Sequence, residues 1–480
     1  CNWLHYNPER SLKSLAKYFT RNLNYNLIHM RKLELQIIVF ALFLSACTST
    51  KTMNELPEIK HPEWVKGASI YEVNIRQFTP EGTFKAFETH VPRLKDLGVE
   101  ILWLMPIHPI GEVNRKGDLG SYYAVKDFLE VNPEFGTKED FQHLVDFIHE
   151  HDMKVIIDWV GNHSSWDNGL TKSHPDWYLH DYKGDFIPPI GWDWSDVIVF
   201  DYEQEGLRNY MTEVLDYWVR EYDIDGYRCD VAGYVPTDFW LSARRSLESI
   251  KPVFLLAEWD DRAMHYAFDM SYAWELEEIM HQVAQGQKNA TAINAYIAKM
   301  INSTRLTEIK MTFTSNHDKN SWEGTVFGRF GKAAENFAAM TFVLEGMPLI
   351  YSGQEVGLKR SLSFFDKDQI EWGDHPFNSL YARLNKLKKD NKALWNGEWG
   401  GRMLPLKTDL PEQVNVIYRE KDGSKVLGMF NASDKEVTFT IQDKLYSDDY
   451  KSFKGRNTVT LTDDQEFTLG PWGYQIYTAK

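Results

Sequence analysis

The feature that most constrains the fold is an alternation of short apolar runs with segments of helical periodicity between residues 69 and 352. In the segment 137–150, for example, Phe141, Leu144, Val145 and Ile148 recur at the spacing of one helix face. Eight such strand–helix units predict an α/β fold, a closed (β/α)8 TIM barrel. The predicted strands cover residues 69–75, 99–105, 154–159, 224–229, 253–257, 266–270, 310–314 and 348–352.

Two departures from this alternation predict further parts of the chain. The connection between the third and fourth strands is longer than one helix needs, and residues 164–203 are rich in Trp, Asp, Gly and Pro. We predict a short inserted domain there, since disordered segments are poor in Trp. After residue 393 short β-rich segments separated by turns predict a C-terminal antiparallel β-sandwich domain over 394–480. The barrel then comprises residues 62–163 and 204–393.

The charge balance limits the kinds of partner. The chain has 53 Lys and Arg against 69 Asp and Glu, a formal net charge of −16. A nucleic-acid-binding protein needs a basic surface. We therefore predict no nucleic-acid partner.

The N-terminal segment is typical of a bacterial lipoprotein signal. A basic start at 30–32 precedes an apolar run at 35–46, about half of the roughly 20 residues that span a bilayer. The run ends in LSAC at 44–47, which resembles a lipoprotein box with Cys47 as the lipidated residue. We predict an untranslated leader at 1–29, a signal peptide at 30–46 and a polar tether at 47–61. The alternative is an ordinary buried helix.

This interpretation places the protein in the cell envelope, lipid-anchored to a membrane on its periplasmic or surface face. It also accounts for the cysteines. With Cys47 lipidated and Cys1 untranslated, Cys229 is the one that remains, so no internal disulfide is expected.

Acidic residues follow four of the predicted strands. Asp158 lies at the end of the third strand, Asp230 ends the fourth, Glu258 follows the fifth and Asp318 follows the seventh. The C-terminal ends of barrel strands meet at one rim. Acids placed directly after apolar runs are costly to desolvate unless they are used or paired. We therefore predict that these four acids share one site.

Two of these acids have contrasting surroundings. Arg228 lies two residues before Asp230 on the same side of a strand, and its charge is expected to lower the pKa of Asp230. Apolar residues precede Glu258, and a dry setting is expected to raise its pKa. Two carboxyl groups with separated pKa values suit a retaining glycosidase, which needs a nucleophile and a proton donor. The alternative is that Arg228 and Asp230 form a structural ion pair.

Four blocks around these acids resemble the signature blocks of glycoside hydrolase family 13, the α-amylase family, in order and approximate spacing. They are DWVGNH at 158–163, GYRCDVA at 226–232, LLAEWD at 255–260 and FTSNHD at 313–318. SYYAVKD at 121–127 and YSGQE at 351–355 resemble two further blocks. The resemblance implies a (β/α)8 barrel, a B-domain after the third strand and a C-terminal β-domain.

The resemblance also implies roles for individual residues. Asp230 matches the nucleophile, Glu258 the general acid/base, and Asp318 the third carboxylate, which holds sugar hydroxyls and stabilises the oxocarbenium-like state. Asp158 is expected to orient its neighbours. The residues that match substrate-binding positions are Tyr123, His163, Arg228 and His317.

The tryptophans supply candidate platforms for sugar rings. A pyranose presents one face of C–H groups, and an aromatic ring offers apolar area at small entropic cost. Packing in the core is the alternative for each of them. The candidates are Trp159, Trp166, Trp192, Trp194 and Trp322.

The sequence departs from the family pattern where calcium is concerned. Asn162 matches the asparagine that binds Ca²⁺ in many members. Those members often carry Lys-His shortly after the nucleophile, whereas this chain has VAGYVP at 231–236. We therefore predict no required cofactor, with Ca²⁺ as an optional ligand at Asn162.

These observations favour a retaining hydrolase that cleaves α-1,4-glucosidic bonds of starch-derived glucans or maltooligosaccharides. A transglycosylase is the near alternative, since a sugar can intercept the same covalent intermediate. A non-catalytic glucan-binding protein on this fold and a barrel metallohydrolase are the others. No His-x-His follows the first strand, which counts against the metallohydrolase.

Overall fold

The computed structural model describes residues 59–444, 446–455 and 458–479. The chain from Ile59 to Lys480 forms one compact unit. The predicted leader, the signal peptide and Cys47 lie outside the described residues. Within the described part, no helix combines the length and the apolar character that crossing a membrane requires.

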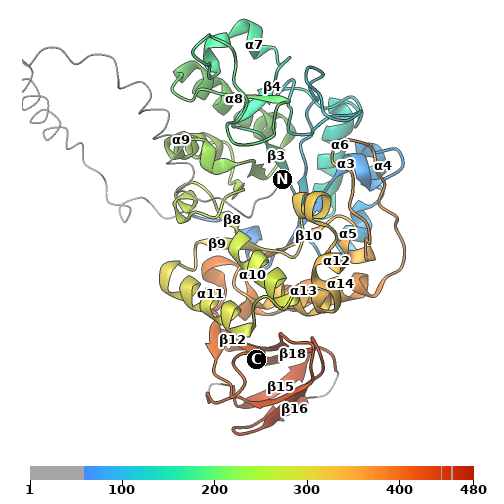
Figure 1. Ribbon diagram of the computed structural model, residues 1–480, viewed down its shortest axis with the longest axis vertical. Coiled ribbons are helices and arrows are strands. Elements are labelled where there is room, and N and C mark those ends of the chain that lie inside the picture. The colour runs from blue at the N-terminus through green and yellow to red at the C-terminus, as the bar shows by residue number, and fades with distance from the viewer. Residues whose placement is uncertain (1–58, 445, 456–457, 480) are drawn as a thin grey trace, which may run out of the picture. The chain divides into compact units, whose positions relative to one another are not determined.

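Eight parallel strands close into a barrel in the order β1-β10-β9-β8-β7-β6-β3-β2 (Figure 1), which confirms the predicted fold. Every strand residue except Lys154 is buried, because one face of each strand lines the barrel interior and the other packs under helices. This is why the strands appear in the sequence as continuous apolar runs. The strands are β1 (Ile70–Val73), β2 (Ile101–Leu104), β3 (Lys154–Trp159), β6 (Gly226–Cys229), β7 (Phe254–Ala257), β8 (Met270–Tyr272), β9 (Ile309–Thr312) and β10 (Met347–Tyr351).

Helices follow the strands along the chain, and most of the longer ones are amphipathic. The predicted helix at 137–150 is confirmed as α6 (Lys138–Glu150), and it begins at a capping box. The Thr137 hydroxyl accepts a bond from the Asp140 N–H, and the Asp140 carboxylate accepts one from the Thr137 N–H. The other helices of eight residues or more are α8 (Glu205–Tyr222), α9 (Thr237–Glu248), α10 (Trp274–Ala284), α11 (Ala290–Ser303), α13 (Ala334–Val343) and α14 (Pro376–Asp390).

The predicted position of the sixth strand was wrong. The prediction placed it at 266–270, but β8 begins at Met270, and residues Arg262–Tyr266 form a 3₁₀ helix. Asp261 caps this helix by accepting a bond from the Ala263 N–H. Asp269 then directs the chain into the sheet, since its buried carboxylate accepts a bond from the Leu255 N–H on β7.

The stretch predicted as the inserted B-domain lies between β3 and α8. It contains a two-stranded antiparallel sheet of β4 (His163–Ser165) and β5 (Val197–Val199). Two short helical turns, Leu170–Ser173 and Pro175–Trp177, lie between these strands in the chain. The Tyr178 ring packs on Phe200 at 4.8 Å, and its hydroxyl lies 2.8 Å from that of Ser164. The domain boundaries predicted from the sequence stay predictions, because the described residues form one unit.

The C-terminal strands form an antiparallel β-domain, as predicted. Its six-stranded sheet has the order β11-β12-β13-β18-β15-β16, and a two-stranded sheet of β14 and β17 shares its core. The sequence pattern predicts strands at 414–418, 425–430, 436–441, 458–461 and 474–477 but not β11, β15 and β17; in β15, for example, only Tyr450 is buried. The strands are β11 (Leu404–Leu406), β12 (Val414–Lys421), β13 (Ser424–Asn431), β14 (Val437–Thr440), β15 (Asp448–Ser452), β16 (Thr458–Leu461), β17 (Glu466–Leu469) and β18 (Tyr474–Ala479).

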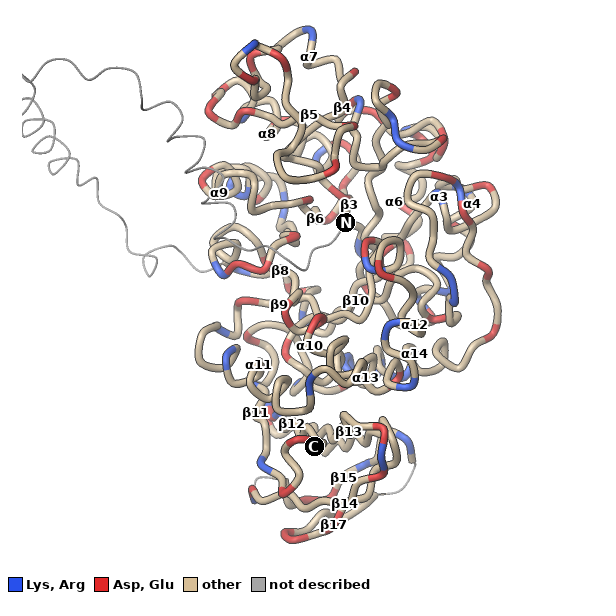
Figure 2. Tube along the Cα trace, in the orientation of Figure 1, with Lys and Arg blue, Asp and Glu red and all other residues tan. Residues whose placement is uncertain are grey.

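Lys and Arg are interspersed with Asp and Glu along the described chain (Figure 2). The absence of a nucleic-acid partner stays a prediction.

Candidate active site

The predicted acids lie at the C-terminal ends of neighbouring strands. β3, β6 and β7 are consecutive in the barrel, and Asp158 on β3 is paired in register with Arg228 on β6. Asp230 follows β6 directly and Glu258 follows β7 directly. The structure therefore brings Asp158, Asp230 and Glu258 to one rim, as predicted for these three acids, and Arg228 lies among them.

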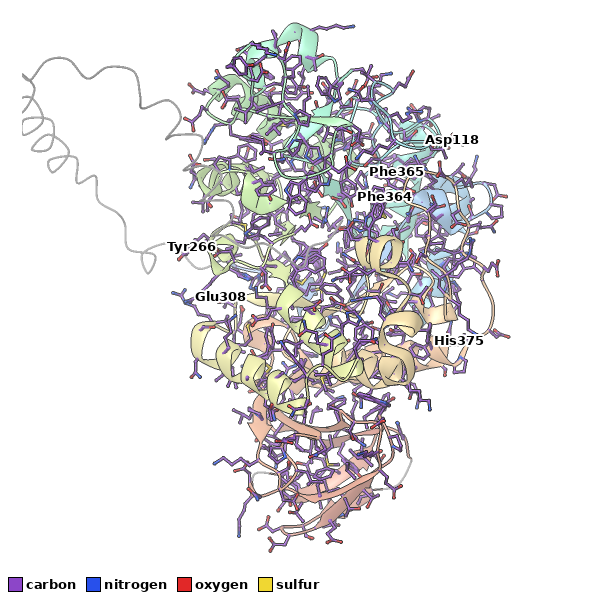
Figure 3. All side chains as sticks on the ribbon, viewed as in Figure 1. Asp118, Tyr266, Glu308, Phe364, Phe365 and His375 are labelled. Atoms are coloured by element: carbon purple, nitrogen blue, oxygen red, sulfur yellow. The ribbon has the colours of Figure 1, made fainter. Side chains whose placement is uncertain are left out.

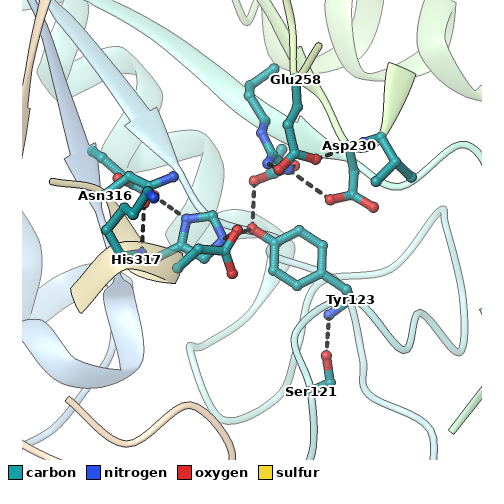
Figure 4. A network of polar contacts seen from close by, with 12 residues as sticks. Ser121, Tyr123, Asp230, Glu258, Asn316 and His317 are labelled. Atoms are coloured by element: carbon teal, nitrogen blue, oxygen red, sulfur yellow. Dashed lines mark hydrogen bonds and ion pairs between the residues drawn. The ribbon is translucent and has the colours of Figure 1, made fainter. Parts of the chain in front are cut away.

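Arg228 is the centre of this group. Its buried Nη1 donates to Asp158 Oδ1 at 2.8 Å and to Asp230 Oδ1 at 2.9 Å, while Nη2 forms an ion pair with Glu258 Oε1 at 2.9 Å (Figure 4). Its Nε donates to the Tyr272 hydroxyl at 3.3 Å. Because one guanidinium holds Asp230 and Glu258 at its two ends, the two carboxylates lie on the same wall of the site.

Three buried carboxylates share the Arg228 cation, but burial has the larger effect on their pKa values. Burial raises the pKa of Glu258 to about 8 and that of Asp230 to about 6, although Arg228 acts in the opposite direction on both. The expected net lowering at Asp230 was therefore wrong, since desolvation outweighs the guanidinium. The pKa of Glu258 rises further than that of Asp230, which is the order that the apolar residues before Glu258 predicted.

His317 and Tyr123 form the opposite side of the network. His317 Nε2 lies 2.8 Å from the Tyr123 hydroxyl and 3.6 Å from Asp318 Oδ2. The Tyr123 hydroxyl also donates to Asp158 Oδ2 at 3.1 Å, and its ring stacks on His317 at 5.5 Å. Asp318, Tyr123 and His317 thus join the same constellation as the two acids on β6 and β7.

Glu72 on β1 is a site residue that the sequence analysis missed. Its fully buried carboxylate bonds His317 Nδ1. Burial opposes a charge on His317, but Asp318 and Glu72 outweigh it and raise the pKa of His317 to about 9. One feature of the sequence could have pointed to Glu72. It is an acid inside the apolar run of the first strand, and such a residue is costly to bury without a partner.

His163 lies on the Asp230 side of the site. Its Nε2 is 4.0 Å from Asp230 Oδ2, and burial lowers the pKa of His163 to about 4. A neutral imidazole beside the acid can donate or accept a hydrogen bond without adding charge. The two histidines therefore differ, with His163 neutral and His317 charged near neutral pH.

The candidate tryptophan platforms fall into separate environments. Trp159 is fully buried against Phe128, which excludes it as a sugar platform. Trp194 lies 5.8 Å from His163 and stacks on Trp192 at 5.1 Å. Trp166 is partly buried, and Trp322 is exposed near the site.

Asn162, the candidate Ca²⁺ ligand, lies beside His163. Its side-chain Nδ2 is 3.1 Å from His163 Nδ1, and its backbone carbonyl accepts a bond from the Phe200 N–H. No group of three or more His, Cys, Asp or Glu placed to hold a metal ion occurs in the part of the chain that the structure describes. Because Ca²⁺ also binds amide and backbone carbonyl oxygens, the optional Ca²⁺ at Asn162 stays a prediction.

A parallel barrel with paired carboxylates and an arginine at its C-terminal rim has the composition of a glycoside hydrolase site. The chain matches the family model described as "Alpha amylase, catalytic domain" over residues 60–395. It therefore belongs to the α-amylase family and is a glycosidase, as its four sequence blocks predicted.

Solved structures and curated relatives agree with this placement. A maltogenic α-amylase, AmyB, from Thermotoga neapolitana is 31% identical, with 86% of this chain and 98% of that chain covered and a TM-score of 0.79. An α-amylase from Lactobacillus plantarum is also 31% identical, with 86% and 99% covered and a TM-score of 0.76. The α-amylase MalA of Haloarcula japonica is 26% identical over 84% of this chain, and the match spans 62% of MalA.

Proposed function

We propose that the protein is a retaining hydrolase of α-1,4-glucosidic bonds in starch-derived glucans and maltooligosaccharides. The observation that carries this proposal is the position of Asp230 and Glu258 at the two ends of the Arg228 guanidinium. A retaining glycosidase needs its two carboxyl groups about 5 Å apart, so that one attacks while the other protonates. The relatives named α-amylase, maltogenic α-amylase and cyclomaltodextrinase support the choice of α-glucans over other glycans.

The first step forms a covalent bond to the enzyme. Ionised Asp230 attacks the anomeric carbon, and the glycosidic C–O bond breaks as Glu258 transfers its proton to the leaving oxygen. Arg228 holds the attacking carboxylate, and Asp318 with the charged His317 binds sugar hydroxyls as the ring flattens. Tyr123 supplies the apolar face beneath that ring.

The second step releases the sugar. Glu258, now ionised, takes a proton from a water molecule, whose oxygen attacks the anomeric carbon and displaces Asp230. Two inversions at one carbon give net retention. The enzyme ends with Glu258 protonated and Asp230 ionised, ready for the next cycle.

The stereochemistry of the product tests this proposal directly. Maltoheptaose incubated with the protein is expected to release sugars whose new reducing ends are first α, with mutarotation following. Proton NMR during the first minutes distinguishes the anomers. Initial release of the β-anomer would contradict a double displacement, and no release at all would contradict the hydrolase assignment.

The pH dependence of kcat/KM follows from the two carboxyl groups. Asp230 must be ionised, so activity should fall as pH drops below about 6, and Glu258 must be protonated, so activity should fall as pH rises above about 8. Initial rates at low maltoheptaose concentration, from about pH 4 to about pH 10, should give a bell-shaped profile. A flat alkaline side would contradict the role of Glu258 as the acid.

We further propose that Cys47 carries a lipid that anchors the protein to a membrane of the cell envelope, on the basis of the LSAC sequence at 44–47. Cys47→Ala is expected to move the protein from the membrane fraction to the soluble fraction. Ser49→Ala is the matched control and should leave the protein in membranes. Retention of the Cys47→Ala variant in membranes would contradict the anchor.

A further inference from the structure

Three aromatic residues, Trp322, Phe364 and Phe365, form an aromatic wall at the edge of the site. Trp322 lies in the helical segment Lys319–Glu323, four residues after Asp318. The two phenylalanines lie in the loop between β10 and α14 (Figure 3). The Trp322 ring is 5.2 Å from Phe364 and 5.8 Å from Phe365, and the two phenylalanines are 5.1 Å apart.

The aromatic wall is continuous with the proposed catalytic site. The Phe364 ring lies 6.1 Å from Tyr123 with an interplanar angle of 15°, and 6.3 Å from His317. Trp322 continues the row beyond Phe364, and 39% of Trp322 is exposed. The row therefore leads from the ring beneath the reacting sugar to an indole that solvent can reach.

Both segments of the aromatic wall are held in place. Asn320 Oδ1 accepts a bond from the Leu362 N–H at 2.8 Å, which ties the Trp322 segment to the Phe364 loop. Gln77 Nε2 donates to the Ser363 carbonyl at 2.7 Å. The Leu119 N–H donates to the Phe365 carbonyl at 3.0 Å. A platform that is fixed before substrate arrives loses little entropy on binding.

The barrel order tells which side of the reacting bond the aromatic wall occupies. Glu258 protonates the leaving oxygen, so the departing glucan lies on the side of β7, where Trp259 and Tyr234 are 5.2 Å apart. The Phe364 loop follows β10, which β9 and β8 separate from β7. Trp322, which follows β9, packs on that loop, and the ring contacts of the loop run to Tyr123 and His317. The aromatic wall therefore faces the glucose units on the non-reducing side of the reacting one.

We propose that Trp322 is a stacking platform for the glucose unit next to the reacting one on its non-reducing side. This proposal rests on the proposed function. Its consequence is a preference for substrates that present at least two glucose units on that side of the cleaved bond. The face of C–H groups on the second pyranose ring would lie on the exposed indole, with Phe364 as the support of the indole.

Glycosyl fluorides test the proposal, because fluoride leaves no sugar on the Glu258 side. α-Glucosyl fluoride fills only the reacting position, and α-maltosyl fluoride adds the second unit. Trp322→Ala is expected to lower kcat/KM for α-maltosyl fluoride about tenfold, the effect of an aromatic contact worth about 1.4 kcal/mol. The value for α-glucosyl fluoride should stay within about twofold, and Trp322→Phe should keep most of the preference for maltosyl fluoride.

Tyr182→Ala, at a residue that is 86% exposed on the inserted stretch, is the control and should change neither value. Trp322→Leu replaces the alanine variant if the melting curve shows that alanine prevents folding. An equal loss on both fluorides, no loss on either, or an unmodified protein without preference for maltosyl fluoride would overturn the platform. Failure of the unmodified protein to turn over either fluoride would instead overturn the proposed function, and the platform with it.

Discussion

Replacing Asp230 with asparagine is expected to lower the turnover of maltoheptaose by roughly four to six orders of magnitude. The amide keeps the size of the side chain and can still accept a bond from Arg228, but it cannot form the covalent intermediate. Turnover is measured from reducing ends released at saturating substrate. The loss should appear in kcat, since the groups that bind the sugar hydroxyls are unchanged.

The same variant should keep or gain stability. Arg228 retains its contacts with Asp158 and Glu258, and the buried carboxylate of Asp230 is replaced by a neutral amide. Asp238→Asn is the matched control, because Asp238 is an exposed acid on α9 that pairs with Arg208. It should change turnover by less than about twofold. Turnover of the Asp230→Asn variant near that of the unmodified protein would remove Asp230 as the nucleophile.

The barrel could be predicted because the burial of its strands leaves a pattern in the local sequence. Both faces of each strand are covered, so the strands appear as unbroken apolar runs, and β3 matches its predicted range of 154–159. The sixth strand was misplaced because its start depends on Asp269, which contacts His61 and Arg244 far away in the sequence. Local periodicity does not depend on such distant contacts, so it could not locate the start of this strand.

The acids of the site could be predicted from architecture, but their electrostatics could not. Placement at strand ends brings Asp230, Glu258 and Asp158 to one rim in any parallel barrel. The net pKa of Asp230 depends on how completely the site is closed to water and on how many acids share Arg228. Both quantities depend on how the barrel is assembled, so the local sequence could not predict them.

Glu72 and the tryptophans are further residues whose surroundings could not be predicted from the sequence. The bond between Glu72 and His317 joins residues 245 positions apart in the chain, which no spacing rule connects. Trp159 and Trp322 were equal candidates for sugar platforms, because the residue type says nothing of exposure. Only packing separates them, since Trp159 is fully buried and Trp322 is 39% exposed.

Replacing Glu258 with alanine is expected to lower kcat/KM for maltoheptaose by roughly 10²- to 10⁴-fold, the usual contribution of a general acid. The alkoxide that leaves from a glucan needs a proton, whereas fluoride leaves without one. Formation of the glycosyl-enzyme from α-maltosyl fluoride should therefore be much less affected. The variant still lacks the base that activates water, so the covalent intermediate should accumulate.

Azide then separates the two roles of Glu258. As an anion it attacks the intermediate without a base, so it should accelerate turnover of α-maltosyl fluoride by Glu258→Ala. Because Asp230 still performs the first inversion, the product should be α-maltosyl azide, which NMR distinguishes from the β-anomer. Glu275→Ala, an exposed acid on α10 that pairs with Lys299, should show neither the loss nor the azide response. A β-azide product would mean that azide attacks the substrate directly, which would contradict a covalent intermediate on Asp230.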